Sequence, residues 1–153
     1  MKKKWWVIGP LAAIVIVFIT WYSLGVAADK REMEKMVSIA DQVQPPASWK
    51  LNGESITGGF LCRDLSASCN SIARNFSTDV TFTPDELRKI GTKAGWELTV
   101  DSDCTPNPQS LGTEYLCTAE TRIDGYSVSL TAVSRGANLP QDLSVYVVKL
   151  RAS

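Results

Sequence analysis

The chain has 153 residues, with 16 basic and 16 acidic side chains and no histidine. Three of the basic residues are the lysines at 2–4, so the rest carries 13 basic against 16 acidic residues, a net charge of −3. This balance argues against nucleic acid as a partner, because phosphate recognition requires a concentrated basic surface. The lack of histidine excludes Ser-His and Cys-His nucleophile arrangements and removes the commonest general base.

A membrane-spanning helix is predicted from Trp5 to Ala28, where 24 consecutive residues carry no charge. A helix of this length measures about 36 Å, which is enough to cross a hydrocarbon core of roughly 30 Å. The aromatic pairs Trp5-Trp6 and Trp21-Tyr22 are spaced to lie at the two membrane–water interfaces. We therefore expect an integral membrane protein with a signal anchor.

The lysines at 2–4 predict the orientation of this anchor, since positive residues stay on the cytoplasmic side. The expected organisation is a cytoplasmic segment 1–4, a transmembrane helix 5–28, an amphipathic helix 29–44 and an extracytoplasmic domain 45–153. The localisation that follows is the cell membrane, with a single pass and the C-terminal domain outside.

The alternative is a secreted protein cleaved after Ala28. Val26-Ala27-Ala28 satisfies the small-residue pattern that signal peptidase reads. The apolar stretch is, however, longer than the about 7–15 residues typical of a signal peptide. This length and the aromatic pairs favour an uncleaved anchor.

Two disulfides are predicted, because an even number of cysteines follows the apolar segment in an oxidising compartment. The four cysteines permit three connectivities, and we favour Cys62–Cys69 with Cys104–Cys117, since each pair encloses a polar segment with turn character. A redox motif would require Cys-x-x-Cys, and a zinc site would require closer cysteine pairs, usually supplemented by histidine.

An amphipathic helix is predicted over 29–44 and should end at Pro45-Pro46. Its apolar residues recur at helical spacing and form one stripe, made of Met33, Met36, Val37, Ala40 and Val43. The stripe is shorter than the three to four heptads that indicate a coiled coil. We therefore expect it to pack on the chain's own sheet.

A second helix is predicted over 84–94 from its capping residues. Thr83 is the expected N-cap, Pro84 the first helical residue, and Glu86 completes a Thr-x-x-Glu capping box. Phe82 and Leu87 occupy the positions of a hydrophobic staple. Gly95 then supplies the C-terminal turn.

The remaining pattern is that of strands, with a tight turn at Asp124-Gly125. The expected strands cover 60–62, 72–76, 96–101, 115–122, 126–134 and 143–150, of which the first two form a hairpin closed by the first disulfide. Trp49 and Trp96 each open an apolar strand pattern and are expected in the core. The sum is an α+β fold, with an antiparallel sheet of four to six strands and one further helix packed on it.

The sequence contains no recognisable catalytic set. Asp101 and Asp103 could suggest calcium, but Pro106 stands where a calcium loop needs glycine, so we predict neither metal nor cofactor. A hydrolase that uses only the carboxylates of Glu97, Asp101 and Asp103 is a less favoured alternative. We expect a protein without enzymatic activity.

The order of elements resembles a type IV pilin subunit: a membrane helix, an amphipathic continuation, and a β-sheet with a disulfide loop late in the chain. The resemblance covers architecture alone. Pilins place a glycine before a Phe-Thr-like pair and a glutamate five residues into the apolar stretch, whereas here Gly9 is followed by Pro10 and the first glutamate is Glu32. We expect a module that presents its domain to a protein partner at the cell envelope, with a pilin-like or accessory subunit of a membrane assembly as the alternative.

Overall fold

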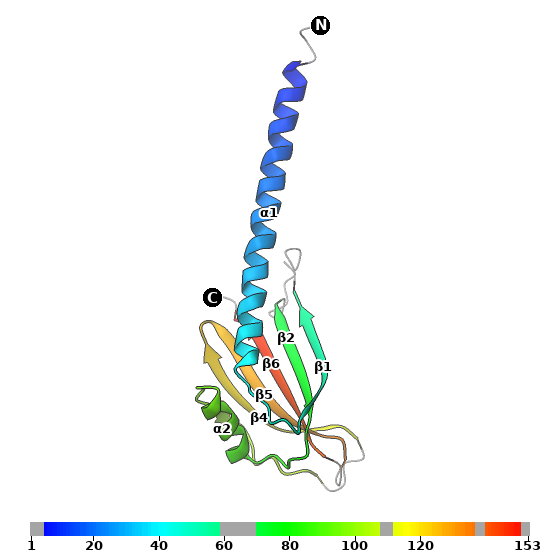
Figure 1. Cartoon of the computed structure of the whole chain (residues 1–153), viewed down its shortest axis with the longest axis vertical. Coiled ribbons are helices and arrows are strands. Elements are labelled where there is room, and N and C mark those ends of the chain that lie inside the picture. The colour runs from blue at the N-terminus through cyan, green and yellow to red at the C-terminus, as the bar shows by residue number, and fades with distance from the viewer. Residues whose placement is uncertain (1–4, 59–69, 108–111, 137–139, 151–153) are drawn as a thin grey trace.

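The structure is a computed structural model of the whole chain, and it describes residues 5–58, 70–107, 112–136 and 140–150, with side chains from residue 12 onward. It has the predicted α+β fold, in which a long N-terminal helix ends in a domain built of an antiparallel sheet and one short helix (Figure 1). The C-terminal part of the long helix belongs to the core of that domain.

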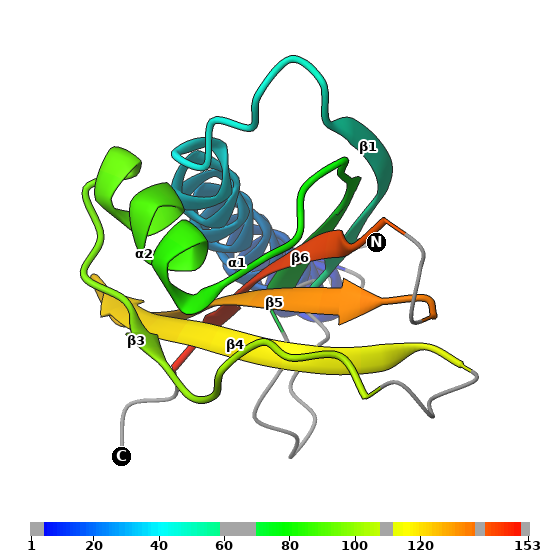
Figure 2. The ribbon, with the colours of Figure 1, turned by 90° about the horizontal axis from the view of Figure 1, so that it is seen from below.

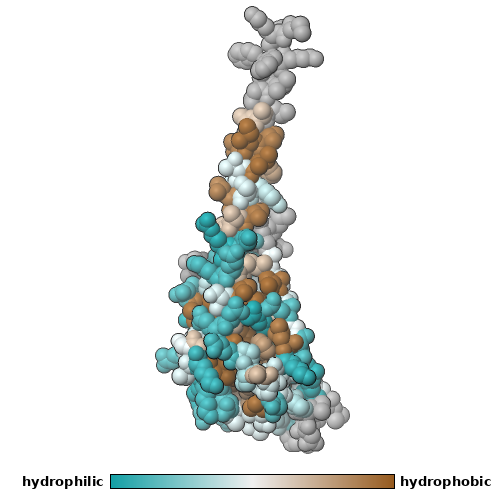
Figure 3. Space-filling view, in the orientation of Figure 1, coloured by the Kyte–Doolittle hydropathy of each residue, from teal (hydrophilic) through white to brown (hydrophobic). Residues whose placement is uncertain are grey.

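Helix α1 (Trp5–Asp41) runs for 37 residues without a break from the apolar segment into the domain. From Ala12 it is long and apolar enough to cross a membrane, and none of its most apolar window is buried within the chain. The apolar part projects from a domain whose visible face is mainly hydrophilic with smaller apolar patches (Figure 3). Its helical conformation ends at Asp41, three residues before the predicted end, although Val43 continues the buried stripe.

The sheet is antiparallel throughout, in the order β1-β2-β6-β5-β4-β3. Its strands are β1 (Lys50–Thr57), β2 (Ser71–Ser77), β3 (Thr99–Val100), β4 (Glu114–Ile123), β5 (Tyr126–Ser134) and β6 (Asp142–Lys149). The last strand in the chain thus lies in the middle of the sheet, between β2 and β5. The predicted tight turn joins β4 to β5, with φ of 50° at Asp124 and 85° at Gly125.

Both helices cover the same face of the sheet (Figure 2). The predicted stripe of α1 packs on this chain's own strands, as Met36 and Ala40, each 1% exposed, show. Alternate residues of β5 and β6 provide the opposing surface, made of Val128, Leu130, Ala132, Leu143, Val145 and Val147. The opposite face of the sheet carries the intervening residues, most of which are hydroxyl-bearing.

Helix α2 (Pro84–Lys93) begins as predicted. The Thr83 hydroxyl accepts a hydrogen bond from the Glu86 backbone N–H at 3.3 Å, and the staple residues Phe82 and Leu87 are fully buried. The Glu86 carboxylate pairs with Lys89 at 2.6 Å rather than returning to the cap. The Thr83 cap and the staple therefore define the start of the helix.

One predicted strand is shorter in the structure than expected, and another falls outside the described residues. Burial alternates over 96–101 as predicted, with Trp96 buried and Glu97 exposed. The paired strand, however, is limited to the two residues of β3, Thr99 and Val100, which pair with β4. Trp96 instead donates its backbone N–H to the Gly91 carbonyl at 2.8 Å, because the segment is still closing the end of α2. The predicted strand 60–62 and the Cys62–Cys69 pair lie outside the described residues, and β2 is paired with β1, which the sequence analysis did not identify as a strand.

Candidate functional site

The three carboxylates considered for catalysis do not line a common hollow in the part of the chain that the structure describes. Glu97 lies with Glu120 and Arg122 beside a hollow of about 780 Å³, whose lining includes neither aspartate. Asp101 and Asp103 are exposed in the loop after β3. Among the described residues, no group of three His, Cys, Asp or Glu side chains is placed to hold a metal ion.

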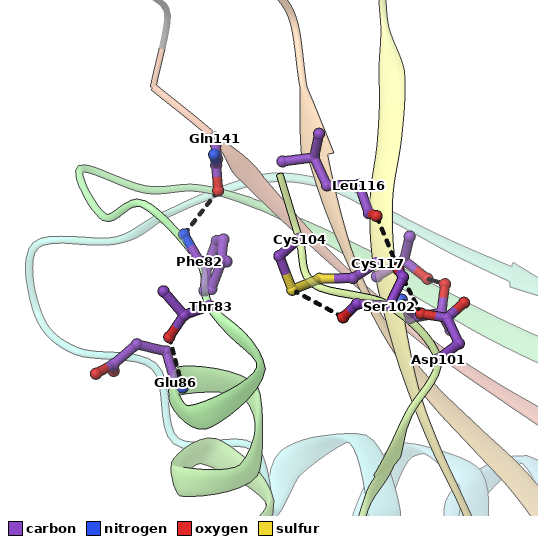
Figure 4. The surroundings of a disulfide bond; sticks show 11 residues. Phe82, Thr83, Glu86, Asp101, Ser102, Cys104, Leu116, Cys117 and Gln141 are labelled. Atoms are coloured by element: carbon purple, nitrogen blue, oxygen red, sulfur yellow. Dashed lines mark hydrogen bonds between the residues drawn. A yellow bond between two sulfur atoms is a disulfide. The ribbon is translucent and has the colours of Figure 1, made fainter. Parts of the chain in front are cut away.

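Asp101 has a structural role in the loop that holds the disulfide (Figure 4). Its carboxylate accepts hydrogen bonds from the Thr118 backbone N–H at 2.7 Å and from the Ser102 hydroxyl at 2.9 Å. The bond from Thr118, more than any other contact, lowers the pKa of Asp101 below its usual value. The carboxylate thus acts as a fixed acceptor that ties the loop to β4.

The predicted Cys104–Cys117 disulfide is present and closes this loop onto β4. Both cysteines are 3% exposed and belong to the apolar core. Cys104 adopts a φ of 57°, a left-handed conformation that is uncommon for residues other than glycine. The covalent link and the Asp101 hydrogen bonds together hold this conformation.

Polar contacts join the sheet to α1 immediately after its apolar segment. Asp29 accepts a hydrogen bond from the Asn70 side chain at 3.3 Å, and Glu32 pairs with Lys149 and accepts a hydrogen bond from the Tyr126 hydroxyl at 3.2 Å. Burial, followed by the charge of Glu32, raises the pKa of Tyr126. We call this set the junction cluster, and it leaves no flexible linker between the apolar helix and the domain.

Arg74 forms a second link between α1 and the sheet. It lies on β2 with its side chain only 14% exposed, and it pairs with Asp41 of α1 at 2.6 Å and with Glu54 of β1 at 2.5 Å. Burial alone would lower the pKa of Arg74, but the hydrogen bonds and charges of the two carboxylates outweigh it and raise that pKa. The guanidinium thereby fixes β1 against the end of α1.

A partly apolar groove of about 490 Å³ lies between the end of α1 and β1. Its apolar lining is Val43, Pro45, Leu51 and Phe76. Arg74 and its ion-pair partners Asp41 and Glu54 line the polar part. Leu51 is 54% exposed, and Ile56, on the same face of β1, is 43% exposed. We call this region, including Ile56, the β1 groove. It borders the edge of the sheet, where β1 pairs with β2 alone among the described strands.

Sequence reasoning missed both the junction cluster and the β1 groove. The one available signal was Tyr126, which heads the inward-facing residues of its strand and whose hydroxyl therefore needed a buried partner. Its partner Glu32 is 94 residues away in the chain, so the pairing depends on the strand order. The chain matches no family model, no curated protein and no solved structure.

Proposed function

We propose that this chain is a single-pass membrane protein that holds a small disulfide-bonded domain outside the cell membrane for interaction with a protein partner at the cell envelope. The observation that carries the proposal is the unbroken helix α1, whose apolar part is exposed while its polar continuation enters the domain core. An exposed apolar helix of this length requires an apolar environment, and the lipid bilayer supplies one.

The orientation in this proposal rests on charge and on the disulfide. Lys2, Lys3 and Lys4 precede the apolar segment, and the first acidic residue, Asp29, follows it. Positive residues remain on the cytoplasmic side. The Cys104–Cys117 disulfide supports an oxidising compartment for the domain, since such links are rare in the cytosol.

The proposed activity is binding, without catalysis. Among the described residues, the hollow that Glu97 lines includes neither Asp101 nor Asp103, and Asp101 is engaged in fixing the loop to β4. Its low pKa keeps the carboxylate charged, which suits a hydrogen-bond acceptor and not a general acid near neutral pH. A carboxylate hydrolase is therefore the less favoured reading.

The β1 groove is the surface that we assign to the protein partner. It combines exposed apolar side chains, Leu51 and Ile56, with a strand edge that can accept main-chain hydrogen bonds from an added strand. Arg74 is already neutralised by Asp41 and Glu54, and these three groups bring the groove to a net charge of −1. The fitting partner is a protein segment in extended conformation with apolar side chains and a basic residue.

Site-specific photocrosslinking in cells tests this assignment. A photoreactive residue at Leu51 or Ile56 of the full chain should yield an adduct with a second polypeptide. The matched control is Thr92, which is exposed on α2. Helix α2 packs against β3 and β4, at the opposite edge of the sheet from β1. Adducts that form equally at all three positions, or at Thr92 alone, would contradict the assignment.

The second candidate function is a pilin-like or accessory subunit, and the observation that favours it is the sheet packed on the far half of one continuous helix. In such an assembly the apolar halves of several copies would pack together. A photoreactive residue at Val17 should then give a ladder in multiples of 16.7 kDa. A single adduct of another mass would favour the presentation of one partner.

A further inference from the structure

A hollow of about 490 Å³ with a mixed polar and apolar lining lies on the face of the sheet opposite the helices. Residues from β1, β2, β4, β5 and β6 line it, and we call it the distal hollow. The residues that matter here are Asn52, Asn75, Tyr115, Arg135, Asp142 and Ser144. Asn75 pairs with Ser144 across the sheet, and the residues flanking each, such as Phe76 and Leu143, point into the core. The lining side chains therefore stand on the uncovered face.

The distal hollow lies at the end of the sheet farthest from the apolar helix. At one end of the β5–β6 pair, Tyr126 opposes Lys149, and both contact Glu32 near the start of the domain. At the other end, Val133 opposes Asp142, which lines the hollow. In a membrane-anchored chain this hollow would thus lie at the end of the domain away from the bilayer.

Its polar groups are of two kinds. Asp142 pairs with Arg135 and accepts a hydrogen bond from Ser77 at 3.0 Å, so its charge is neutralised within the chain. The side chains of Asn52, Asn75 and Ser144 and the Tyr115 hydroxyl make no hydrogen bond among the described residues. The hollow is therefore uncharged as a whole and offers free donors and acceptors.

Tyr115 adds an exposed aromatic ring at the rim of the hollow. It is 76% exposed, more than any other large hydrophobic residue in the part of the chain with described side chains. An aromatic ring pairs well with the C–H faces of a ligand, and its hydroxyl stays available to solvent or ligand. Each asparagine amide can both donate and accept, which suits neighbouring hydroxyl groups that also do both.

From this combination we propose that the distal hollow binds an uncharged saccharide, with one sugar ring stacked on Tyr115 and its hydroxyl groups bonded to Asn75, Asn52 and Ser144. The hollow does not favour an anionic ligand, because the negative charge of Asp142 offsets the positive charge of Arg135. A purely apolar ligand would leave the free amides without partners, at a desolvation cost. The chemistry is shared by free oligosaccharides and by the glycan strands of a cell wall.

Saturation-transfer NMR with the full chain in nanodiscs tests the proposal, because this method detects weak binding from the ligand side. The probes are the N-acetylglucosamine tetramer and maltohexaose, and a parallel arm measures retention of the same protein on insoluble cell-wall sacculi. Tyr115→Ala and Asn75→Ala should each weaken binding about tenfold, as expected for the loss of one stacked ring or one bidentate polar contact. Tyr115→Phe keeps the ring and should bind nearly as well as the wild type.

Tyr146→Ala is the matched control, since Tyr146 lies on the same face of the sheet but does not line the hollow. Binding to sacculi alone, lost in Tyr115→Ala, would identify the polymer as the source of the sugar. The proposal is overturned if the wild type binds neither probe nor sacculi, or if Tyr115→Ala and Asn75→Ala bind like Tyr146→Ala. Near-ultraviolet circular dichroism of each variant verifies that the fold is retained, which keeps every comparison interpretable.

Discussion

Replacing Cys104 and Cys117 together by alanine should destabilise the domain by about 3 kcal/mol. The two cysteines are 13 positions apart, so the disulfide closes a loop of 14 residues. In the chain-entropy model a loop of this size restricts the unfolded chain by about 3 kcal/mol at 25 °C. Alanine is the suitable replacement because both positions are buried, and serine would place unpartnered hydroxyl groups in the core.

The expected change in the thermal midpoint follows from the size of the domain. Each kcal/mol corresponds to about 4 °C in a domain of roughly a hundred residues or slightly more. The double variant should therefore unfold more than about 10 °C below the wild type. Near-ultraviolet circular dichroism of the purified chain in detergent is the assay, because Trp96 and Trp49 pack in the domain core while the long helix dominates the far-ultraviolet signal.

Thr105→Ala is the control, since it lies in the same loop, is exposed and leaves the disulfide intact. Its midpoint should equal that of the wild type. An unchanged midpoint in the double variant would refute the loop-entropy reasoning. Mass spectrometry of non-reduced peptides should also find Cys104 linked to Cys117 and Cys62 linked to Cys69, and a crossed link would refute the predicted connectivity.

Three further predictions concern single contacts and one concerns the anchor. Gly91→Ala should lower the thermal midpoint although alanine favours helices, because the added Cβ would lie 2.5 Å from the Leu98 side chain. Its control is Gly53→Ala, whose Cβ would enter open space and should leave the thermal midpoint nearly unchanged. Asp101→Asn should lower the free energy of unfolding at pH 7. Because the folded state lowers the pKa of Asp101, the difference in stability between the wild type and the variant should shrink as the pH falls below about 4. A difference that does not change with pH would contradict the role of the charged carboxylate as the acceptor for Thr118. Tyr126→Phe removes the hydrogen bond to Glu32 and should cost about 1 kcal/mol in chemical denaturation, with Ser127→Ala as the neutral neighbour. Protease added to spheroplasts should digest the domain after residue 28, and N-terminal sequencing of the membrane fraction should find residues upstream of Asp29; a soluble species that begins at Asp29 would show cleavage after Ala28.

The parts of the fold that the sequence predicted well are those encoded by neighbouring residues. The start of α2 depends on Thr83, Pro84 and the buried residues Phe82 and Leu87, all within six positions. The β4–β5 hairpin depends on one dipeptide, because only residues tolerant of positive φ form such a turn. The Cys104–Cys117 link was predictable for the same reason, since the loop that it closes is short.

The parts that the sequence did not predict depend on distant partners. Strand β1 has an almost fully exposed burial pattern, because it is an edge strand with a bulge between Leu51 and Gly53, and its sequence lacks the alternation that marks a half-buried strand. The insertion of β6 between β2 and β5 pairs residues that are far apart in the chain, such as Ser71 and Val148, which are 77 positions apart. The Arg74 ion pairs and the β1 groove form only once this order is set, and the distal hollow likewise draws on five strands. No local pattern could have indicated these sites.

The position of the junction cluster limits where a partner can approach the domain. Glu32 lies four residues beyond Ala28, about 6 Å along a helix, so the sheet begins directly after the segment that we assign to the membrane. The Asp124-Gly125 turn, which adjoins Tyr126 and Lys149, would therefore lie close to the lipid surface. Asp41, which borders the β1 groove, is 13 residues beyond Ala28, or about 20 Å.

The domain is fixed to α1 at both ends of residues 29–41, by Asp29 and Glu32 at one end and by Arg74 at the other. The tilt of the anchor therefore sets the direction in which the β1 groove and the distal hollow face. A glycine-rich insertion at Ala28 would uncouple the orientation of the domain from the tilt of the anchor. It should weaken partner crosslinking at Ile56, because that contact depends on the orientation of the domain. Saccharide binding in nanodiscs should stay unchanged, because it does not depend on that orientation.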